Sequence, residues 1–420
     1  MKNYLTSLLL LISFSIHAQI TQPAQPSSGP GGSDYTHGGV TIYDYATNGN
    51  GEDFWLYEPN NPVPDSANVI VFCHGLGMTN PKAYGAFIKH LVRKGNIVIY
   101  PRYQRTLNLG TGIAEYNDSC AKGIKKALDT IQQPGHVKGR VYNYFILGHS
   151  VGGVLTANMT MLYQQYGLPK PLTAFSMQPG ASTYLMNDYS PFPADVKFLI
   201  AVGDNDAIVG TAPGTTIYNQ TVAVPTSHKN LIHHYADNHG SPAIQASHNE
   251  PCGFDNQFDN GETNLFIPFV TGTVDAMDYF CYWKLQDALM DCALNNQNCE
   301  YAFGDTPEQH GMGNWSDGTP VRILEVTPGA TTLANNLEND LDISIYPNPN
   351  SAGRWQLLVG SKIAGNEFIL FDVNGGIIVQ SPILHQESQI ETGETAKGVY
   401  FYQIKNSSNE ILKSGKLAIN

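Results

Sequence analysis

Short apolar runs alternate with amphipathic stretches between residues 68 and 206, and this alternation constrains the fold more than any other feature of the chain. The apolar runs are long enough for buried strands, and each ends in a Gly-rich or polar turn. Such a pattern predicts a mostly parallel sheet with helices on both faces, whose ligands bind beyond the carboxyl ends of the strands. Strands are expected at 68–75, 96–103, 142–150, 172–180 and 197–206, and helices at 84–95, 114–131 and 152–167.

The two ends of the chain differ from this central region. Lys2, an apolar run over 5–16 and Ala18 predict a secretory signal over residues 1–18, because the run is too short to cross a bilayer. Composition changes near Thr327 to polar and turn-forming residues, which predicts a linker over 327–341. Short alternating strands then predict a small β-sandwich over 342–420, after an α/β domain over 19–326.

Charge and cysteine content restrict the partners and the compartment. The net charge is −13, from 36 acidic and 23 basic residues, and we find no dense basic run, which argues against nucleic acid or an anionic membrane as partner. Six cysteines in an exported chain permit disulfides. Cys292 and Cys299 are the easiest pair to close, Cys252 with Cys281 is a possible second pair, and Cys73 is expected to be a buried thiol.

The pentapeptide from Gly148 to Gly152, GHSVG, matches G-x-S-x-G and follows a predicted strand directly before a predicted helix. This strand–turn–helix setting is the one in which a serine becomes an exposed nucleophile, so Ser150 is the expected nucleophile. A serine hydroxyl needs a base and an orienting carboxylate. Asp206, after the strand at 197–206, is the favoured acid, with Asp204 as the alternative.

The base is expected beyond the last strand, and His239 is the favoured residue because it lies in a loop before Gly-Ser-Pro. His248 and His310 are the alternatives. His233 and His234 lie within the apparent strand, where neighbouring side chains point to opposite faces, so a metal site that uses both is disfavoured.

The remaining requirement is a pair of backbone N–H groups for a developing oxyanion. Val151 supplies one, directly after Ser150, and Leu76 in the HGLG turn is the expected second donor. Gly148 and Gly152 leave room for the sharp turn. His74 is expected to be a structural hydrogen-bonding residue.

On these residues the chain resembles the α/β-hydrolase superfamily over about residues 67–298. The resemblance implies that Ser150 is the nucleophile, Asp206 the acid and His239 the base. The segments SGPGGSDY, IVIYPRYQ, NHGSP, YWKLQDAL and MGNWSDGTPV are similar to a group of secreted bacterial hydrolases. His149 stands where the polyester-hydrolase branch often has Trp, which argues against polyester cleavage.

The C-terminal segment resembles the type A sorting domain of type IX secretion in Bacteroidetes. YPNP at 346–349, the NGG turn at Asn374 and GVYFYQI from Gly398 carry this resemblance. It implies export to the cell surface or beyond, with the type IX secretion machinery as a partner. A β-sandwich that binds carbohydrate or a surface is the alternative.

Together these features predict a secreted serine hydrolase that cleaves a small or lipid-like carboxylic ester and needs no cofactor. The segment over 241–273 is expected to form a cap over the site. An amidase or peptidase with the same triad, or a non-catalytic surface-binding protein on a hydrolase scaffold, are the alternatives.

Overall fold

The computed structural model divides the chain into two compact units, Met1–Gly329 and Ala330–Asn420. The residues described are 19–46, 51–104, 113–180, 186–262, 272–328, 343–350, 353–359, 366–373, 375–385, 387–392, 396–406 and 411–420. The predicted signal over 1–18, Asn374 of the NGG turn and most of the linker lie outside these residues. No helix within the described ranges is long and apolar enough to cross a membrane.

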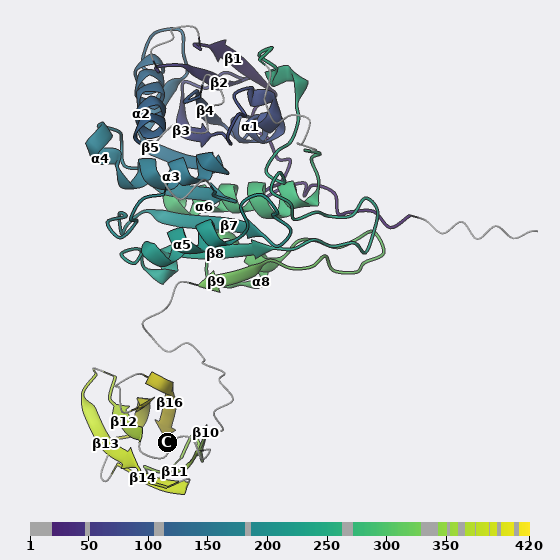
Figure 1. Ribbon diagram of the computed structural model, residues 1–420. Coiled ribbons are helices and arrows are strands. Elements are labelled where there is room, and N and C mark those ends of the chain that lie inside the picture. Colours follow the sequence, from purple (N-terminus) through teal and green to yellow (C-terminus); the bar gives the residue numbers. More distant parts are fainter. Residues whose placement is uncertain are drawn as a thin grey trace, which may run out of the picture. The chain divides into compact units, whose positions relative to one another are not determined.

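The first unit is built on a nine-stranded mixed sheet in the order β1-β2-β4-β3-β5-β6-β7-β8-β9 (Figure 1). The six strands from β4 to β8 in this order run parallel. At the two edges of this group β2 pairs antiparallel with β4 and β9 with β8, and β1 pairs antiparallel with β2. The predicted α/β class with a mostly parallel sheet is therefore confirmed. The strands are β1 (Gly39–Asp44), β2 (Phe54–Asn60), β3 (Ser66–Cys73), β4 (Asn96–Pro101), β5 (Lys138–His149), β6 (Thr173–Met177), β7 (Lys197–Gly203), β8 (Lys229–His234) and β9 (Glu325–Pro328).

Both faces of the sheet are covered by helices. Consecutive residues of each central strand point to opposite sides, so each strand contributes side chains to both hydrophobic clusters. Ile70 and Phe72 of β3 belong to the hydrophobic cluster formed with α1 (Gly85–Arg93), the π-helical turn Asp278–Trp283 and α6 (Lys284–Asn295). Val69 and Val71 belong to the cluster on the other face, with α2 (Ile113–Thr130), α3 (Val151–Met161) and α5 (Ala212–Gln220). Figure 1 shows these helices on either side of the sheet.

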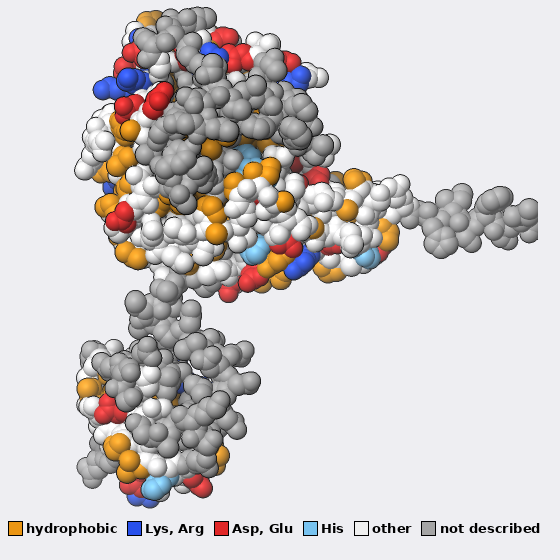
Figure 2. Space-filling view, viewed as in Figure 1, with side chains coloured by type: hydrophobic (Ala, Val, Ile, Leu, Met, Phe, Trp, Pro, Cys, Tyr) orange, Lys and Arg blue, Asp and Glu red, His pale blue; other side chains and the backbone are white. Residues whose placement is uncertain are grey.

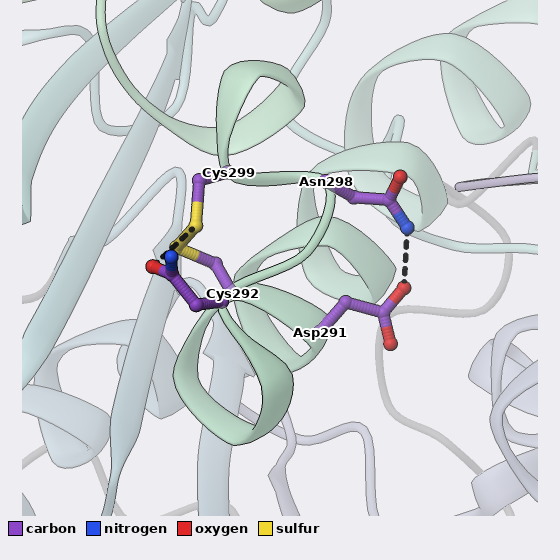
Figure 3. The surroundings of a disulfide bond; sticks show 5 residues. Asp291, Cys292, Asn298 and Cys299 are labelled. Carbon is purple, nitrogen blue, oxygen red and sulfur yellow. Dashed lines mark hydrogen bonds between the residues drawn. A yellow bond between two sulfur atoms is a disulfide. The ribbon is translucent and has the colours of Figure 1, made fainter.

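Short helical turns complete the first unit. They are the 3-10 turns at Pro81–Tyr84, Thr226–His228 and Asn256–Phe258, and the one-turn helices α4 (Tyr163–Tyr166), α7 (Cys299–Ala302) and α8 (Pro307–His310). The predicted disulfide between Cys292 and Cys299 is present and ties α6 to α7, beside a hydrogen bond from Asn298 to Asp291 (Figure 3). Cys252 and Cys281 do not pair with each other but are separate buried thiols. Cys73 and Cys120 are also buried free thiols, with their sulfur atoms 3.9 Å apart.

The C-terminal unit consists of two antiparallel sheets, β10-β11-β14 and β13-β12-β15-β16. A single hydrophobic cluster, to which Trp355 and Phe368 belong, takes side chains from both sheets, as a sandwich does. The strands are β10 (Ile343–Tyr346), β11 (Arg354–Val359), β12 (Asn366–Phe371), β13 (Ile377–Ile383), β14 (Glu387–Glu391), β15 (Gly398–Lys405) and β16 (Ile411–Ile419).

The boundary after the first unit differs from the prediction at one point. Thr327 and Pro328, which were assigned to the linker, lie in β9 and pair with Leu231 and Asn230 of β8. Pro328 is tolerated there because β9 is an edge strand, where a missing N–H need not break a ladder on its outer side.

Candidate functional site

Ser150 lies between the last residue of β5 and the first residue of α3, at the carboxyl-terminal edge of the parallel strands. Its backbone has φ +58° and ψ −124°, a conformation that costs a non-glycine residue about 1–3 kcal/mol. A Cβ on Gly148 would approach the Gly152 carbonyl oxygen to 2.3 Å, and one on Gly152 would approach the Cys73 carbonyl oxygen to 2.1 Å. The G-x-S-x-G spacing therefore corresponds to a turn too tight for side chains at both glycines.

Three side chains form a continuous hydrogen-bonded chain at this edge. Nε2 of His248 lies 2.9 Å from Oγ of Ser150, and Nδ1 of His248 lies 2.7 Å from Oδ2 of Asp206. Because a carboxylate only accepts, Nδ1–H donates to Asp206 and Nε2 is left to accept the Ser150 proton. The geometry is that of a nucleophile, a base and an orienting acid.

Asp206 is held as a carboxylate by its surroundings. Burial raises its pKa, but the hydrogen bond to His248, the charge of that imidazole and two backbone donors outweigh burial, so the net pKa lies below the ordinary aspartate value. The two donors are the N–H groups of Ile208 and Val209, 2.9 and 3.0 Å from Oδ1. Oδ1 is thus occupied by backbone, and Oδ2 faces the imidazole.

The segment that carries His248 is fixed by three consecutive carbonyl groups. The Ala246 carbonyl accepts from the Asn205 N–H at 3.2 Å, the Ser247 carbonyl from Gln178 Nε2 at 2.5 Å, and the His248 carbonyl from His149 Nε2 at 2.7 Å. Asn205 and Gln178 come just after β7 and β6, and His149 is the last residue of β5; these three strands are neighbours in the sheet. His248 is therefore docked directly on the strand ends that present Ser150 and Asp206.

The prediction that His239 meets Ser150 is wrong, and the alternative His248 takes that position. His239 is hydrogen-bonded to Asp317 at 2.8 Å and is over one third exposed. After β8 the chain runs through a bridge between Asp237 and Ile244 and returns to the strand ends only at Ala246, so the first loop histidine stays outside the site. His310 binds Asp305 and the Leu324 carbonyl.

The sequence contains one short pattern that indicates an ordered position for His248. Ser247-x-x-Glu250 has the spacing of a capping box, and Oε1 of Glu250 accepts from the Ser247 N–H at 3.2 Å. This spacing indicates an ordered turn around His248. The same residues fall inside the segment expected to be a cap, so at least part of that segment supplies the site itself.

The other sequence-predicted residues lie as follows. Asp204, the alternative acid, is exposed and contacts the Ala236 N–H, whereas Asp206 faces the imidazole. His234 is buried against Tyr282, and His233 stacks on Tyr235. His74 donates from Nδ1 to the Gly75 carbonyl and stacks on Tyr103, and burial lowers its pKa to about 3.

The loop after β3, expected to supply an oxyanion donor, lies against Ser150. A Cβ on Gly75 would be 3.4 Å from Cβ of Ser150. The next N–H groups belong to Leu76 and Gly77, and the Gly77 N–H is already bound to Gln104 Oε1 at 2.6 Å. Val151 is the first residue of α3, where a helix leaves its N–H groups without intrahelical acceptors. Leu76 and Val151 remain the candidate donors.

No group of three or more His, Cys, Asp or Glu side chains that could hold a metal ion occurs among the described residues. The acidic residues of the loop over 255–262 form ion pairs with basic side chains of the protein. Asp259 pairs with Lys82 at 2.7 Å, and Glu262 with Arg102 at 2.8 Å. Figure 2 shows charged side chains of both signs interspersed on the visible face.

Comparison with known proteins identifies the C-terminal unit. Residues 344–420 match the family model described as the secretion system C-terminal sorting domain, the domain by which the type IX machinery recognises its cargo. The protein is accordingly exported and is secreted or held at the outer surface. No curated protein matches the chain.

Proposed function

We propose that the first unit is a serine hydrolase of the α/β-hydrolase type that cleaves carboxylic esters outside the cell. The single observation that carries this proposal is the Ser150–His248–Asp206 chain, at 2.9 and 2.7 Å, on a strained strand-to-helix turn. Strained backbone conformations that the surrounding structure enforces cluster at active sites.

The proposed reaction follows from the positions of the protons. Ser150 Oγ attacks the carbonyl carbon while Nε2 of His248 takes its proton, and Asp206 stabilises the imidazolium that forms. The Leu76 and Val151 N–H groups would bind the oxyanion. His248 then returns the proton to the leaving alcohol, and water, activated by the same imidazole, releases the acyl group from Ser150.

The same three side chains can cleave an amide, so an amidase is the second candidate. An ester is named first because an alcohol leaves an acyl group more readily than an amine does, and the imidazole of His248 could protonate either leaving group. A panel of nitrophenyl esters and peptide anilides separates the two once a reactive serine is demonstrated.

The first test is intact mass after treatment with a fluorophosphonate, for wild type and for Ser150→Ala, His248→Ala and His239→Ala. We expect one adduct on wild type, none on Ser150→Ala, and a rate lowered by about 10²–10⁴-fold in His248→Ala, since general-base help of that size is lost. His239→Ala is the matched control, because it removes an imidazole–aspartate pair outside the site. A folded wild type that stays unlabelled would refute the proposal, and slow labelling of His239→Ala would reassign the base.

A further inference from the structure

His149, the residue before Ser150, is completely enclosed and uses both ring nitrogens. Nε2 lies 2.7 Å from the His248 carbonyl oxygen, and Nδ1 lies 2.8 Å from the Tyr84 hydroxyl. A carbonyl can only accept, so Nε2 carries the proton and Nδ1 must accept from Tyr84. Burial and the nearby His248 hold the pKa of His149 well below its usual range, so the ring is neutral and this tautomer is fixed.

Tyr84 extends this connection to the loop beside the nucleophile. Its hydroxyl oxygen accepts from the Gly75 N–H at 3.0 Å while its proton is directed to His149. Burial raises the pKa of Tyr84 well above its usual value, which keeps the hydroxyl protonated. The Gly75 N–H is thereby occupied, and the following N–H, that of Leu76, is left as the candidate oxyanion donor.

We propose that His149 is a positioning residue that sets the place of the base through the His248 carbonyl and, through Tyr84, the place of the oxyanion loop. It would do so without touching the substrate. The chain Gly75–Tyr84–His149–His248 joins two segments that approach Ser150 from different parts of the sequence. The expected effect of His149 on the rate of labelling at Ser150 rests on the proposed function. Its expected effect on the His248–Asp206 hydrogen bond does not.

The variants are chosen to separate positioning from packing. His149→Phe keeps a ring and removes both hydrogen bonds, and His149→Gln keeps an N–H donor at the position of Nε2. Tyr84→Phe removes only the hydroxyl. Tyr282→Phe is its matched control, because that hydroxyl is also buried and lies 2.9 Å from an imidazole nitrogen, Nε2 of His234.

Two measurements are made on the full chain: the second-order rate constant of fluorophosphonate labelling, and the low-field proton resonance of the His248 Nδ1–H. A misplacement of about 1 Å costs on the order of 10²-fold in rate. We therefore expect about 10²-fold slower labelling in His149→Phe, with recovery to within about tenfold in His149→Gln. Tyr84→Phe should be slower than Tyr282→Phe, and the resonance should broaden or shift in His149→Phe.

Wild-type labelling and an unchanged resonance in His149→Phe would overturn the proposal. Equal losses in Tyr84→Phe and Tyr282→Phe would also overturn it, since they would indicate a general loss of packing. If wild type itself is not labelled, the proposed function fails, and the resonance alone decides: its loss in His149→Phe but not in Tyr282→Phe supports positioning, and its persistence refutes it.

Discussion

Glu250 gives the sharpest prediction about stability, because it is a largely buried acid two residues after His248. Burial, together with the charge of Asp275, raises its pKa from 4.5 to about 7, although its hydrogen bonds to Ser247 act in the opposite direction. The folded protein thus binds this proton more tightly than the unfolded chain. Below pH 4.5 the contribution of protonated Glu250 to the free energy of unfolding is fully present. This contribution is lost as the pH rises from 4.5 to about 7, and the free energy of unfolding does not depend further on Glu250 above that pH.

The size of this loss follows from the shift. At 1.36 kcal/mol per pH unit, the change from pH 4.5 to pH 8 amounts to about 3 kcal/mol. Glu250→Gln keeps an oxygen acceptor for Ser247 and has no charge, so the variant should gain about 3 kcal/mol relative to wild type over this range. Asp275 and Asp278, whose pKa values burial also raises, would leave a residual slope in both proteins.

The assay is urea unfolding at constant ionic strength between pH 4.5 and pH 8, followed by tryptophan fluorescence. Three of the four tryptophans, Trp55, Trp283 and Trp315, lie in the first unit. Glu308→Gln serves as the control, since Glu308 is exposed on α8, and it should follow the wild-type curve. Parallel curves for Glu250→Gln and wild type would refute the reasoning, and so would a variant that is less stable at pH 8.

Two further predictions concern the acid and the thiols. Asp206→Asn should lower the labelling rate by about 10⁴-fold, because the amide would present an N–H to Nδ1 of His248 and move the imidazole proton to Nε2, and a loss below about tenfold would contradict this role. The four unpaired cysteines should resist a thiol reagent in the native protein, because burial keeps the reagent away from their sulfur atoms, and all four should react after unfolding without reduction. These cysteines are Cys73, Cys120, Cys252 and Cys281. Mass spectrometry counts the adducts, and rapid labelling of the native protein would contradict the burial of these thiols.

The parts of the fold that were predictable are those set by local sequence. Apolar runs and helical periodicity located the central strands and helices because each element buries its own face. The turn at Ser150 was predictable for the same reason, since two glycines and the strand before them lie within a few residues. Asp206 was predictable because it follows directly on β7.

The position of His248 was not predictable in this way, because it depends on contacts between distant segments. Three donors from three strand ends hold residues 246–248, and neither their pairing nor the bridge between Asp237 and Ile244 has a signature in the spacing of histidines. The same holds for β9, whose Thr327 and Pro328 have the composition of a linker and become a strand only because the edge of β8 is free to pair.

The docking of residues 246–248 also has a consequence for how this protein can vary. The path that leads to His248 from the end of β8 is anchored at Asp237, which bridges to Ile244 and accepts hydrogen bonds from Trp315 Nε1 at 3.1 Å and from the Arg322 N–H at 2.9 Å. Between these two residues the chain carries exposed side chains, those of Asn238, His239, Ser241 and Pro242. A laboratory library confined to these four positions should therefore alter the surface beside the site while His248 stays in place.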